Sequence, residues 1–377
     1  MIIKGYRKRS MQNALKSIAA KKLVQDIVSG MGIFINSNCP TLPVNSDIYK
    51  KFAETVNHDL QYDEKELQIL YMGAYIVTVS NASLTNEISD QIAMILSNNT
   101  DFYSQDTLNK NPYMKKIKLP CIKAGMWEVC SHYYKPMEIF CTESLTDKSF
   151  GKFGIAEGRI EFPAFVKDGN TWMSISYSEI ETMQASVEKA NGKILVLGLG
   201  MGYYAYMVHI KDNVSSIDIV EKDSDVINIF QTYILPQFDH PEKIHIIKND
   251  AYNYLETLRG GEYSFCFADI WIDAMDGMQH YLRLKHYEKI LSLPTDYWLE
   301  DSIVYTMLSI VYEKILEGYG RSNMIGFIKK SPYFSKVFSL IEQLVDEIQI
   351  SSPQELINAY TIEWLISTIN NEDLTII

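Results

Sequence analysis

Cysteines are few in this sequence, and their pattern argues against two classes of protein. The 377 residues contain an odd number of them, with no C-x-x-C spacing: Cys39, Cys121, Cys130, Cys141 and Cys266. Disulfide-stapled domains and cysteine zinc sites need paired or clustered cysteines, so we expect neither. The pattern favours a reducing compartment and predicts a cytoplasmic protein.

Long hydrophobic runs are also absent from the sequence. The longest cover residues 69–79 and 303–312, whereas a helix needs about 20 predominantly apolar residues to cross a bilayer. We therefore expect both runs to be buried core, and we expect no membrane partner.

An excess of basic residues is missing as well. The chain has 35 lysines and arginines against 47 aspartates and glutamates, for a net charge of −12. This balance argues against a nucleic-acid partner held by a broadly basic surface. The hydrophobic fraction of 47% with 22% charged residues is typical of a folded globular chain and excludes disordered and fibrous classes. A small-molecule substrate is the expected partner.

The first 25 residues depart from this acidic balance. They carry basic residues and no acidic ones: Lys4, Arg7, Lys8, Arg9, Lys16, Lys21 and Lys22. Such a stretch suits an organelle presequence or a helix on a membrane surface. Its apolar residues also follow a helical period between a Ser10 cap and a Gly30 stop, and we favour an ordinary packed helix.

The length suits two or three domains, and the residue pattern divides the chain into four regions. Residues 1–100 are expected to be a helical domain, with helices over residues 46–58 and after the capping residue Asp63. Residues 101–180 are expected to form a small β-rich region with a hairpin turn at residues 167–170. A Rossmann-like domain is expected over residues 181–300, and a helical region over residues 301–377. The large helical N-terminal part could form a contact between copies in a homo-oligomer.

Strands and helices alternate from Gly192 onward. Short apolar strands are expected over residues 193–197, 216–220, 244–248 and 263–268, and helices over residues 203–210, 224–235 and 252–259. This alternation predicts an α/β fold with a doubly wound, mostly parallel Rossmann-like sheet. Further strands are not legible after Asp301.

Four successive strand ends carry a glycine turn or an acid. Residues 198–202 read Gly-Leu-Gly-Met-Gly after the first strand, and Glu221, Asp250 and Asp269 follow the next three. Ligands of open parallel sheets bind outside these strand ends. Glycines let a ligand approach the backbone closely, and a carboxylate can accept hydrogen bonds from the hydroxyls of a ribose. Each acid alone also suits a helix cap, so the prediction depends on all four together.

This arrangement resembles the class I S-adenosylmethionine-dependent methyltransferases and, within them, the spermidine-synthase-like branch. The resemblance covers Gly192 to about Leu284, roughly a quarter of the chain, and implies S-adenosylmethionine as cofactor. It implies that the glycine turn holds the methionine end, Glu221 the ribose, and Asp250 with Ala251 the adenine, and that Lys222 also contacts the cofactor. Asp269 would lie beside the methyl group or the substrate and is the candidate catalytic residue. The turn residues implied as contacts are Gly198, Leu199, Gly200 and Gly202.

The sequence departs from this family at three positions. Val196 stands where an acid often precedes the glycine turn, and Met201 stands where polyamine synthases have an aspartate. Their second aspartate is also missing, because Ile272 occupies its place and Asp273 lies one residue further on. Without these anions a positively charged aminopropyl group is poorly held. We therefore favour methyl transfer, with aminopropyl transfer and a catalytically silent cofactor-binding protein as alternatives.

A dinucleotide site is a further alternative that the glycine spacing disfavours. A dinucleotide fingerprint has its third glycine three residues after the second, where this chain has Tyr203. Here the third glycine is Gly202, two residues after Gly200.

Candidate substrate contacts lie on both sides of the glycine turn. Tyr203 and Trp271 could wall the crevice and favour a sulfonium by cation–π contact, although core packing suits them as well. Ser174 and Glu179 fall in a segment that, by the resemblance to this family, would cover the substrate. The same segment also suits the polar start of a helix. No metal is expected, because the family's metal-dependent members need a further acid–amide pair beyond acids such as Asp269, Asp273 and Asp276.

Overall fold

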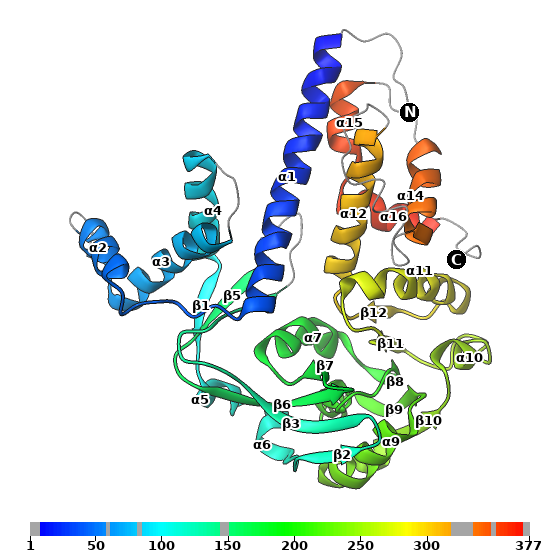
Figure 1. Cartoon of the computed structure of the whole chain (residues 1–377). Coiled ribbons are helices and arrows are strands. Elements are labelled where there is room, and N and C mark those ends of the chain that lie inside the picture. Colours follow the sequence, from blue (N-terminus) through cyan, green and yellow to red (C-terminus); the bar gives the residue numbers. More distant parts are fainter. Residues whose placement is uncertain are drawn as a thin grey trace. The chain divides into compact units, whose positions relative to one another are not determined.

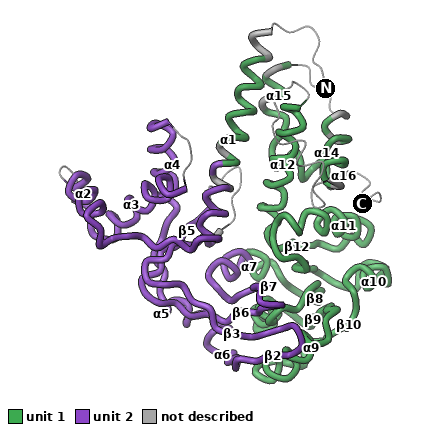
Figure 2. The backbone as a smooth tube through the Cα atoms, in the orientation of Figure 1, with its two compact units in different colours: residues 1–26, 185–377 green, residues 27–184 purple. Residues whose placement is uncertain are grey.

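A computed structural model describes residues 8–57, 61–80, 85–143, 151–317, 335–347 and 352–371 (Figure 1). The chain forms two compact units (Figure 2). Unit 1 comprises residues 1–26 and 185–377, and unit 2 comprises residues 27–184. The division falls inside helix α1 (Lys8–Asn38) and inside helix α7 (Tyr177–Lys189).

Helix α1 packs as predicted but does not stop at Gly30. Ala14, Leu15 and Ile18 are buried, which suits a packed helix. The helix continues to Asn38, and Met31 and Ile35 beyond the glycine are buried in an apolar cluster with Met72 and Ile76. Gly30 costs helix stability, but burial of these two side chains on the same helix outweighs that cost.

Three helices of unit 2 follow α1, and two of them begin where the sequence predicts. Helix α2 (Asp47–Val56) is capped by Ser46, and α3 (Glu64–Val79) begins with a capping box in which Asp63 and Glu66 bond each other's backbone. Helix α4 (Asn86–Asn98) is capped by Thr85. The apolar run over residues 69–79 is core, because Met72 and Ile76 are fully buried.

Unit 2 also contains two sheets, the first mixed and the second antiparallel. The first has the order β1-β5-β4, from β1 (Thr100–Tyr103), β4 (Ile139–Glu143) and β5 (Lys152–Ala156). The second has the order β2-β3-β6-β7, from β2 (Ile122–Ala124), β3 (Trp127–Tyr134), β6 (Ile160–Lys167) and β7 (Asn170–Ser174). Two short helices, α5 (Gln105–Leu108) and α6 (Pro112–Lys116), lie between β1 and β2.

The predicted hairpin turn joins β6 and β7. Lys167 pairs with Asn170, and the two residues between them have positive φ angles, +49° at Asp168 and +80° at Gly169. Positive φ at both central positions is the geometry of a type I′ hairpin.

Unit 1 is a mixed α/β unit with a five-stranded parallel sheet. Its order is β10-β9-β8-β11-β12, and every neighbouring pair is parallel. The strands are β8 (Gly192–Leu197), β9 (Val214–Glu221), β10 (Ile244–Lys248), β11 (Phe265–Ala268) and β12 (Thr295–Tyr297). The first four match the predicted strands within two residues, and the parallel pairing is confirmed.

The helices between these strands are α8 (Tyr203–His209), α9 (Ser224–Ile229), α10 (Ala251–Leu255) and α11 (Ala274–Leu291). The predicted helix over residues 224–235 changes form on the way, because α9 gives place to a π-helical turn η1 (Phe230–Ile234) and a 3-10 turn η2 (Leu235–Gln237). A second 3-10 turn, η3 (Pro241–Lys243), precedes β10. Helix α10 ends four residues earlier than the predicted helix.

The fifth strand, β12, precedes Asp301 and was not predicted. It has three residues, too few to show a hydrophobic period, and its place is fixed by pairing with β11. In the described residues after β12 the chain is helical, as expected: α12 (Glu300–Glu317), α14 (Ser335–Glu347), α15 (Pro353–Ala359) and α16 (Ile362–Asn371). The apolar run over residues 303–312 is core, because Val304 and Val311 are fully buried.

None of the helices in the described ranges combines the length and the apolar character of a membrane span.

Candidate functional site

The carboxyl ends of the unit 1 strands lie along one edge of the sheet (Figure 1). Leu197 at the end of β8 pairs with Val220 on one side and with Ala268 on the other, and Glu221 pairs with Lys248. The order runs outward from β8 to β10 in one direction and from β11 to β12 in the other. Open α/β sheets bind ligands at this reversal. The structure therefore brings the four predicted strand ends to one edge.

The glycine turn after β8 depends on backbone conformations that glycine adopts most readily. Gly198, Gly200 and Gly202 have φ angles of +96°, +50° and +68°. A Cβ at Gly198 would lie 2.0 Å from the carbonyl oxygen of Asp269, and one at Gly202 would lie 2.4 Å from the ring of Phe230. The turn therefore lies directly against the chain that leaves β11.

Glu221 connects the end of β9 to the glycine turn. Its Oε2 accepts a hydrogen bond from the Leu199 amide at 3.1 Å, and its Oε1 accepts one from the Asp223 amide at 2.8 Å. Burial raises the pKa of the Glu221 carboxyl, and these backbone bonds oppose the rise. A carboxylate has about four lone pairs on its two oxygens, so the Glu221 side chain keeps capacity to accept a further hydrogen bond. The adjacent Lys222 is exposed.

Asp250 caps helix α10. This is the structural role that an acid at a strand end can have without any ligand. Its Oδ1 accepts hydrogen bonds from the amides of Tyr252 at 2.9 Å and Asn253 at 3.3 Å. Within the described part of the chain its Oδ2 has no hydrogen bond. Ala251, the first residue of α10, is buried. One carboxyl oxygen of Asp250 thus holds the helix, and the second is available to a ligand.

Asp269 differs from the other two acids. Its backbone amide donates to Leu197 at 2.9 Å, but its partly buried side chain has no hydrogen-bond or ion-pair partner among the described residues. Burial raises the pKa of its carboxyl to about 7 because removal from water disfavours the charged form. A carboxyl group that titrates near neutrality can take up a proton at neutral pH.

The two predicted aromatic contacts are buried more deeply than a simple lining role requires. Tyr203 and Trp271 are each 2% exposed. The Trp271 indole packs against Gly277 of α11, where an added Cβ would lie 3.1 Å from Nε1. That buried nitrogen has no hydrogen-bond partner among the residues that the structure describes. Both rings therefore pack in the core of unit 1. Their contact with a substrate stays a prediction.

A histidine that sequence reasoning did not select lies beside these residues. His280 Nδ1 shares a hydrogen bond of 2.6 Å with the Tyr252 hydroxyl, and the His280 ring stacks at 6.0 Å from Tyr252 and at 6.3 Å from Trp271. Burial lowers the pKa of His280, and the nearby charges of Asp276 and Lys222 act in opposite directions. No sequence signal marked it, because its partners are 28 and 9 residues away along the chain.

Ser174 and Glu179 lie in unit 2. Glu179 Oε1 accepts a hydrogen bond from the Ser174 amide at 3.1 Å, which joins the end of β7 to the first turn of α7. This contact suits the start of a helix. A role in covering a substrate stays a prediction.

Asp273 and Asp276, which follow β11, accept hydrogen bonds from backbone amides. Asp273 caps α11 by accepting hydrogen bonds from the amides of Met275 and Asp276, and Asp276 Oδ2 accepts one from Ile272. Across the described ranges, no group of three or more histidine, cysteine, aspartate or glutamate side chains is placed to hold a metal ion.

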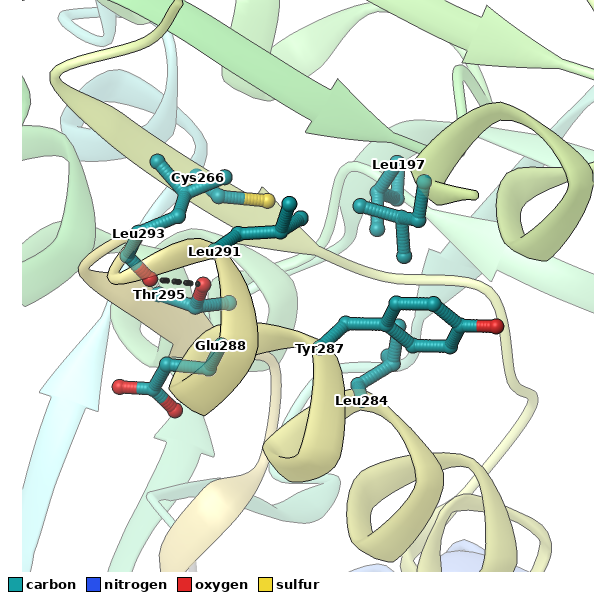
Figure 3. Close-up of a pocket in the computed structure, with 9 residues that line it drawn as sticks. Leu197, Cys266, Leu284, Tyr287, Glu288, Leu291, Leu293 and Thr295 are labelled. Atoms are coloured by element: carbon teal, nitrogen blue, oxygen red, sulfur yellow. Dashed lines mark hydrogen bonds between the residues drawn. The ribbon is translucent and has the colours of Figure 1, made fainter. Parts of the chain in front are cut away.

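A small hollow of about 10 Å³ is lined in part by residues of α11 (Figure 3). Its polar groups are already engaged: Thr295 Oγ1 donates to the Leu293 carbonyl, and Glu288 accepts from Tyr297 and faces Lys285. Most of the other side chains around it are apolar, among them Leu197, Leu284 and Leu291. The hollow is a gap in core packing and not the candidate site.

No known family model matches the chain, and no curated protein matches it. Among solved structures it is similar to a spermidine synthase from Thermotoga maritima, with 16% identity over 53% of this chain and 74% of the other and a TM-score of 0.31. It is also similar to a conserved hypothetical protein from Streptococcus pyogenes (17% identity, 31% of this chain and 69% of the other, TM-score 0.26). A third match is a putative O-methyltransferase from Klebsiella pneumoniae (17% identity, 40% of this chain and 67% of the other, TM-score 0.24). Each TM-score lies below 0.5, so no property of these proteins is transferred to this chain.

Proposed function

We propose that the chain is an S-adenosylmethionine-dependent methyltransferase acting on a small-molecule acceptor, with its site at the carboxyl edge of the unit 1 sheet. The observation that carries the proposal is the Asp269 carboxyl, which lacks a partner in the described part of the chain. It begins the segment that follows β11, at the reversal of strand order and next to the glycine turn. A carboxyl group with no structural bond, and a pKa raised to about 7, suits a functional role.

The groups around Asp269 fit the cofactor that the sequence resemblance implies. The glycine turn leaves its backbone open to close approach, because no side chain is attached at residues 198, 200 or 202. Glu221 keeps acceptor capacity for a ribose hydroxyl, and Asp250 keeps Oδ2 for an amino group. The ends of β9 and β10 thus offer acceptors for a nucleoside beside the glycine turn.

Methyl transfer requires little acid–base catalysis from the protein. When bound, S-adenosylmethionine supplies a methyl group on a positively charged sulfur that leaves as a neutral thioether. The leaving group needs no proton, so the chain has to align the acceptor and take up its proton. We assign that uptake to the Asp269 carboxylate, because burial raises its pKa to about 7.

Methyl transfer is favoured over aminopropyl transfer by the side chains near Asp269. Met201 is fully buried within the glycine turn, and Ile272 after β11 is 46% exposed. Asp273, the nearest substitute for a missing anion, already caps α11. An aminopropyl ammonium therefore has few anionic partners at this edge.

Calorimetric titration of the full chain tests the proposal. We expect S-adenosylmethionine and S-adenosylhomocysteine each to bind with one site per chain. The absence of both heat and a thermal shift at millimolar ligand contradicts the proposal. Tighter binding of decarboxylated S-adenosylmethionine instead favours aminopropyl transfer. Binding without transfer to any compound in a panel of hydroxyl, thiol and amine acceptors favours a catalytically silent binding protein.

A further inference from the structure

Two cysteines of unit 2 lie opposite each other across a pair of strands. In the antiparallel pair of β2 and β3, Ile122 faces Val129, Lys123 faces Glu128 and Ala124 faces Trp127. One step further along the same register places Cys121 opposite Cys130. Side chains of directly opposed residues point to the same face of a sheet. The two thiols are therefore neighbours, although eight residues separate them in the sequence.

A second observation places the same two residues together. Both line one hollow in unit 2 that has a volume of about 570 Å³ and is partly open to solvent. Cys121 is exposed and Cys130 is partly exposed, and both are free thiols. Small molecules in solution can therefore reach the pair.

We propose that Cys121 and Cys130 form a redox-active dithiol, which a low-molecular-weight disulfide such as oxidised glutathione converts to an intramolecular disulfide. Directly opposed residues have Cβ atoms about 4.5–5.5 Å apart, and a disulfide needs about 3.5–4.5 Å. The required approach is about 1 Å. Strand β2 is three residues long and lies at an edge of its sheet, so it can move by that amount without disturbing a second neighbour.

The two cysteines have different roles in the exchange. The Cys121 thiolate attacks one sulfur of oxidised glutathione and releases one glutathione thiolate, leaving a mixed disulfide. The Cys130 thiolate then attacks the Cys121 sulfur, forms the protein disulfide and releases the second glutathione. Two protein thiols and one oxidised glutathione thus give one protein disulfide and two reduced glutathiones.

The electrostatics of Cys130 support this order. Burial raises the pKa of the Cys130 thiol, and the charges of Glu128 and Cys121 raise it further. A nearby thiol has such an effect only at short range. A thiol with a raised pKa reacts slowly with an external disulfide, so the exposed Cys121 reacts first and Cys130 resolves the mixed disulfide.

The experiment counts free thiols in the unfolded full chain after native-state incubation with oxidised glutathione. The reduced chain has five thiols, and we expect three after oxidation, with no attached glutathione. Peptide mapping without reduction is expected to show Cys121 joined to Cys130. The Cys130→Ser variant should stop at one glutathione attached to Cys121. The matched variant Cys39→Ser removes another exposed cysteine of unit 2 and should lose two thiols, as the parent does.

Three results overturn the proposal. One is a chain that keeps all five thiols under these conditions. Another is stable attachment of glutathione to Cys121 in the parent chain, at the level seen in Cys130→Ser. The third is a disulfide that joins either residue to Cys39, Cys141 or Cys266. The proposal does not depend on the methyltransferase assignment, because both cysteines lie in unit 2 and the candidate site lies in unit 1.

Discussion

The Asp269 carbonyl oxygen occupies the space in which Gly198 would carry a Cβ, only 2.0 Å from that position. The glycine turn and the chain leaving β11 are therefore in direct contact. Gly198→Ala must push these two segments apart, and it also places alanine at a φ of +96°. We expect at least a tenfold loss of affinity for S-adenosylhomocysteine, measured by calorimetry, and a lower melting temperature.

The control for this substitution is Gly158→Ala. An added Cβ at Gly158 meets no atom within 4 Å, so the same chemical change should leave affinity and melting temperature close to those of the parent. Equal cofactor affinity in Gly198→Ala and the parent would show that the turn does not hold the ligand.

Asp269→Asn tests the assigned proton uptake. Removal of a general base lowers a rate by about 10²–10⁴-fold, and we expect a loss of this size in kcat once an acceptor is known. Because the pKa of Asp269 is about 7, the parent's kcat should rise with pH up to about pH 8 and then level off. The variant should lose that rise while binding S-adenosylhomocysteine within a few-fold of the parent. A parent profile that is flat from pH 5 to 8 speaks against Asp269 as the base.

The same carboxyl group predicts how stability depends on pH. Its pKa rises from an ordinary value of 3.8 to about 7 on folding, so the folded state binds the proton more tightly than the unfolded chain does. The free energy of unfolding should therefore fall as pH rises from about 4 to about 7. Asp269→Asn should be more stable than the parent at pH 8 by up to about 4 kcal/mol, measured by urea unfolding. The two proteins should differ little at pH 4.

Glu221→Gln tests the connection between β9 and the glycine turn. An amide side chain offers one acceptor oxygen, so the amide of Leu199 or that of Asp223 loses its partner. We expect cofactor affinity to fall by about tenfold to a hundredfold, which corresponds to about 1–3 kcal/mol. The exposed Glu54→Gln is the control, and it should bind like the parent. Unchanged affinity in Glu221→Gln would remove Glu221 from the site.

A buried ion pair in unit 1 joins the middle of α1 to α12. Lys22 Nζ lies 3.1 Å from Glu313 Oε1, and the two side chains are 8% and 7% exposed. Lys22→Met leaves the Glu313 carboxylate buried without this cation and should lower the free energy of unfolding by about 3–5 kcal/mol. Urea unfolding measures it. The double variant Lys22→Met with Glu313→Leu should recover most of the loss.

The exposed pair of Lys50 and Asp47 provides the comparison. These side chains are 65% and 90% exposed, so Lys50→Met should change the unfolding free energy by less than about 1 kcal/mol. An equally small effect of Lys22→Met would mean that α1 is not held against α12 in solution.

Short-range rules were enough for much of the fold. The Asp63 capping box and the turn at Asp168 and Gly169 depend on residues within a few positions of each other, and they formed where expected. Gly30 failed as a helix stop because Met31 and Ile35, which follow it, are buried on the same helix. Strand β12 was missed because its three residues carry no period of their own and depend on pairing with β11.

The sequence by itself determined that glycines and acids end successive strands, since strand period and residue type can be read along the chain. Only the tertiary structure decided how the acids differ. The Asp250 and Glu221 carboxylates accept hydrogen bonds from nearby backbone amides, whereas the Asp269 carboxyl has no hydrogen-bond partner in the described residues and has a raised pKa. Burial and unused lone pairs depend on segments that arrive from elsewhere in the chain. His280 shows the same limit, because its contacts with Tyr252 and Trp271 exist only after β10, β11 and α11 are assembled.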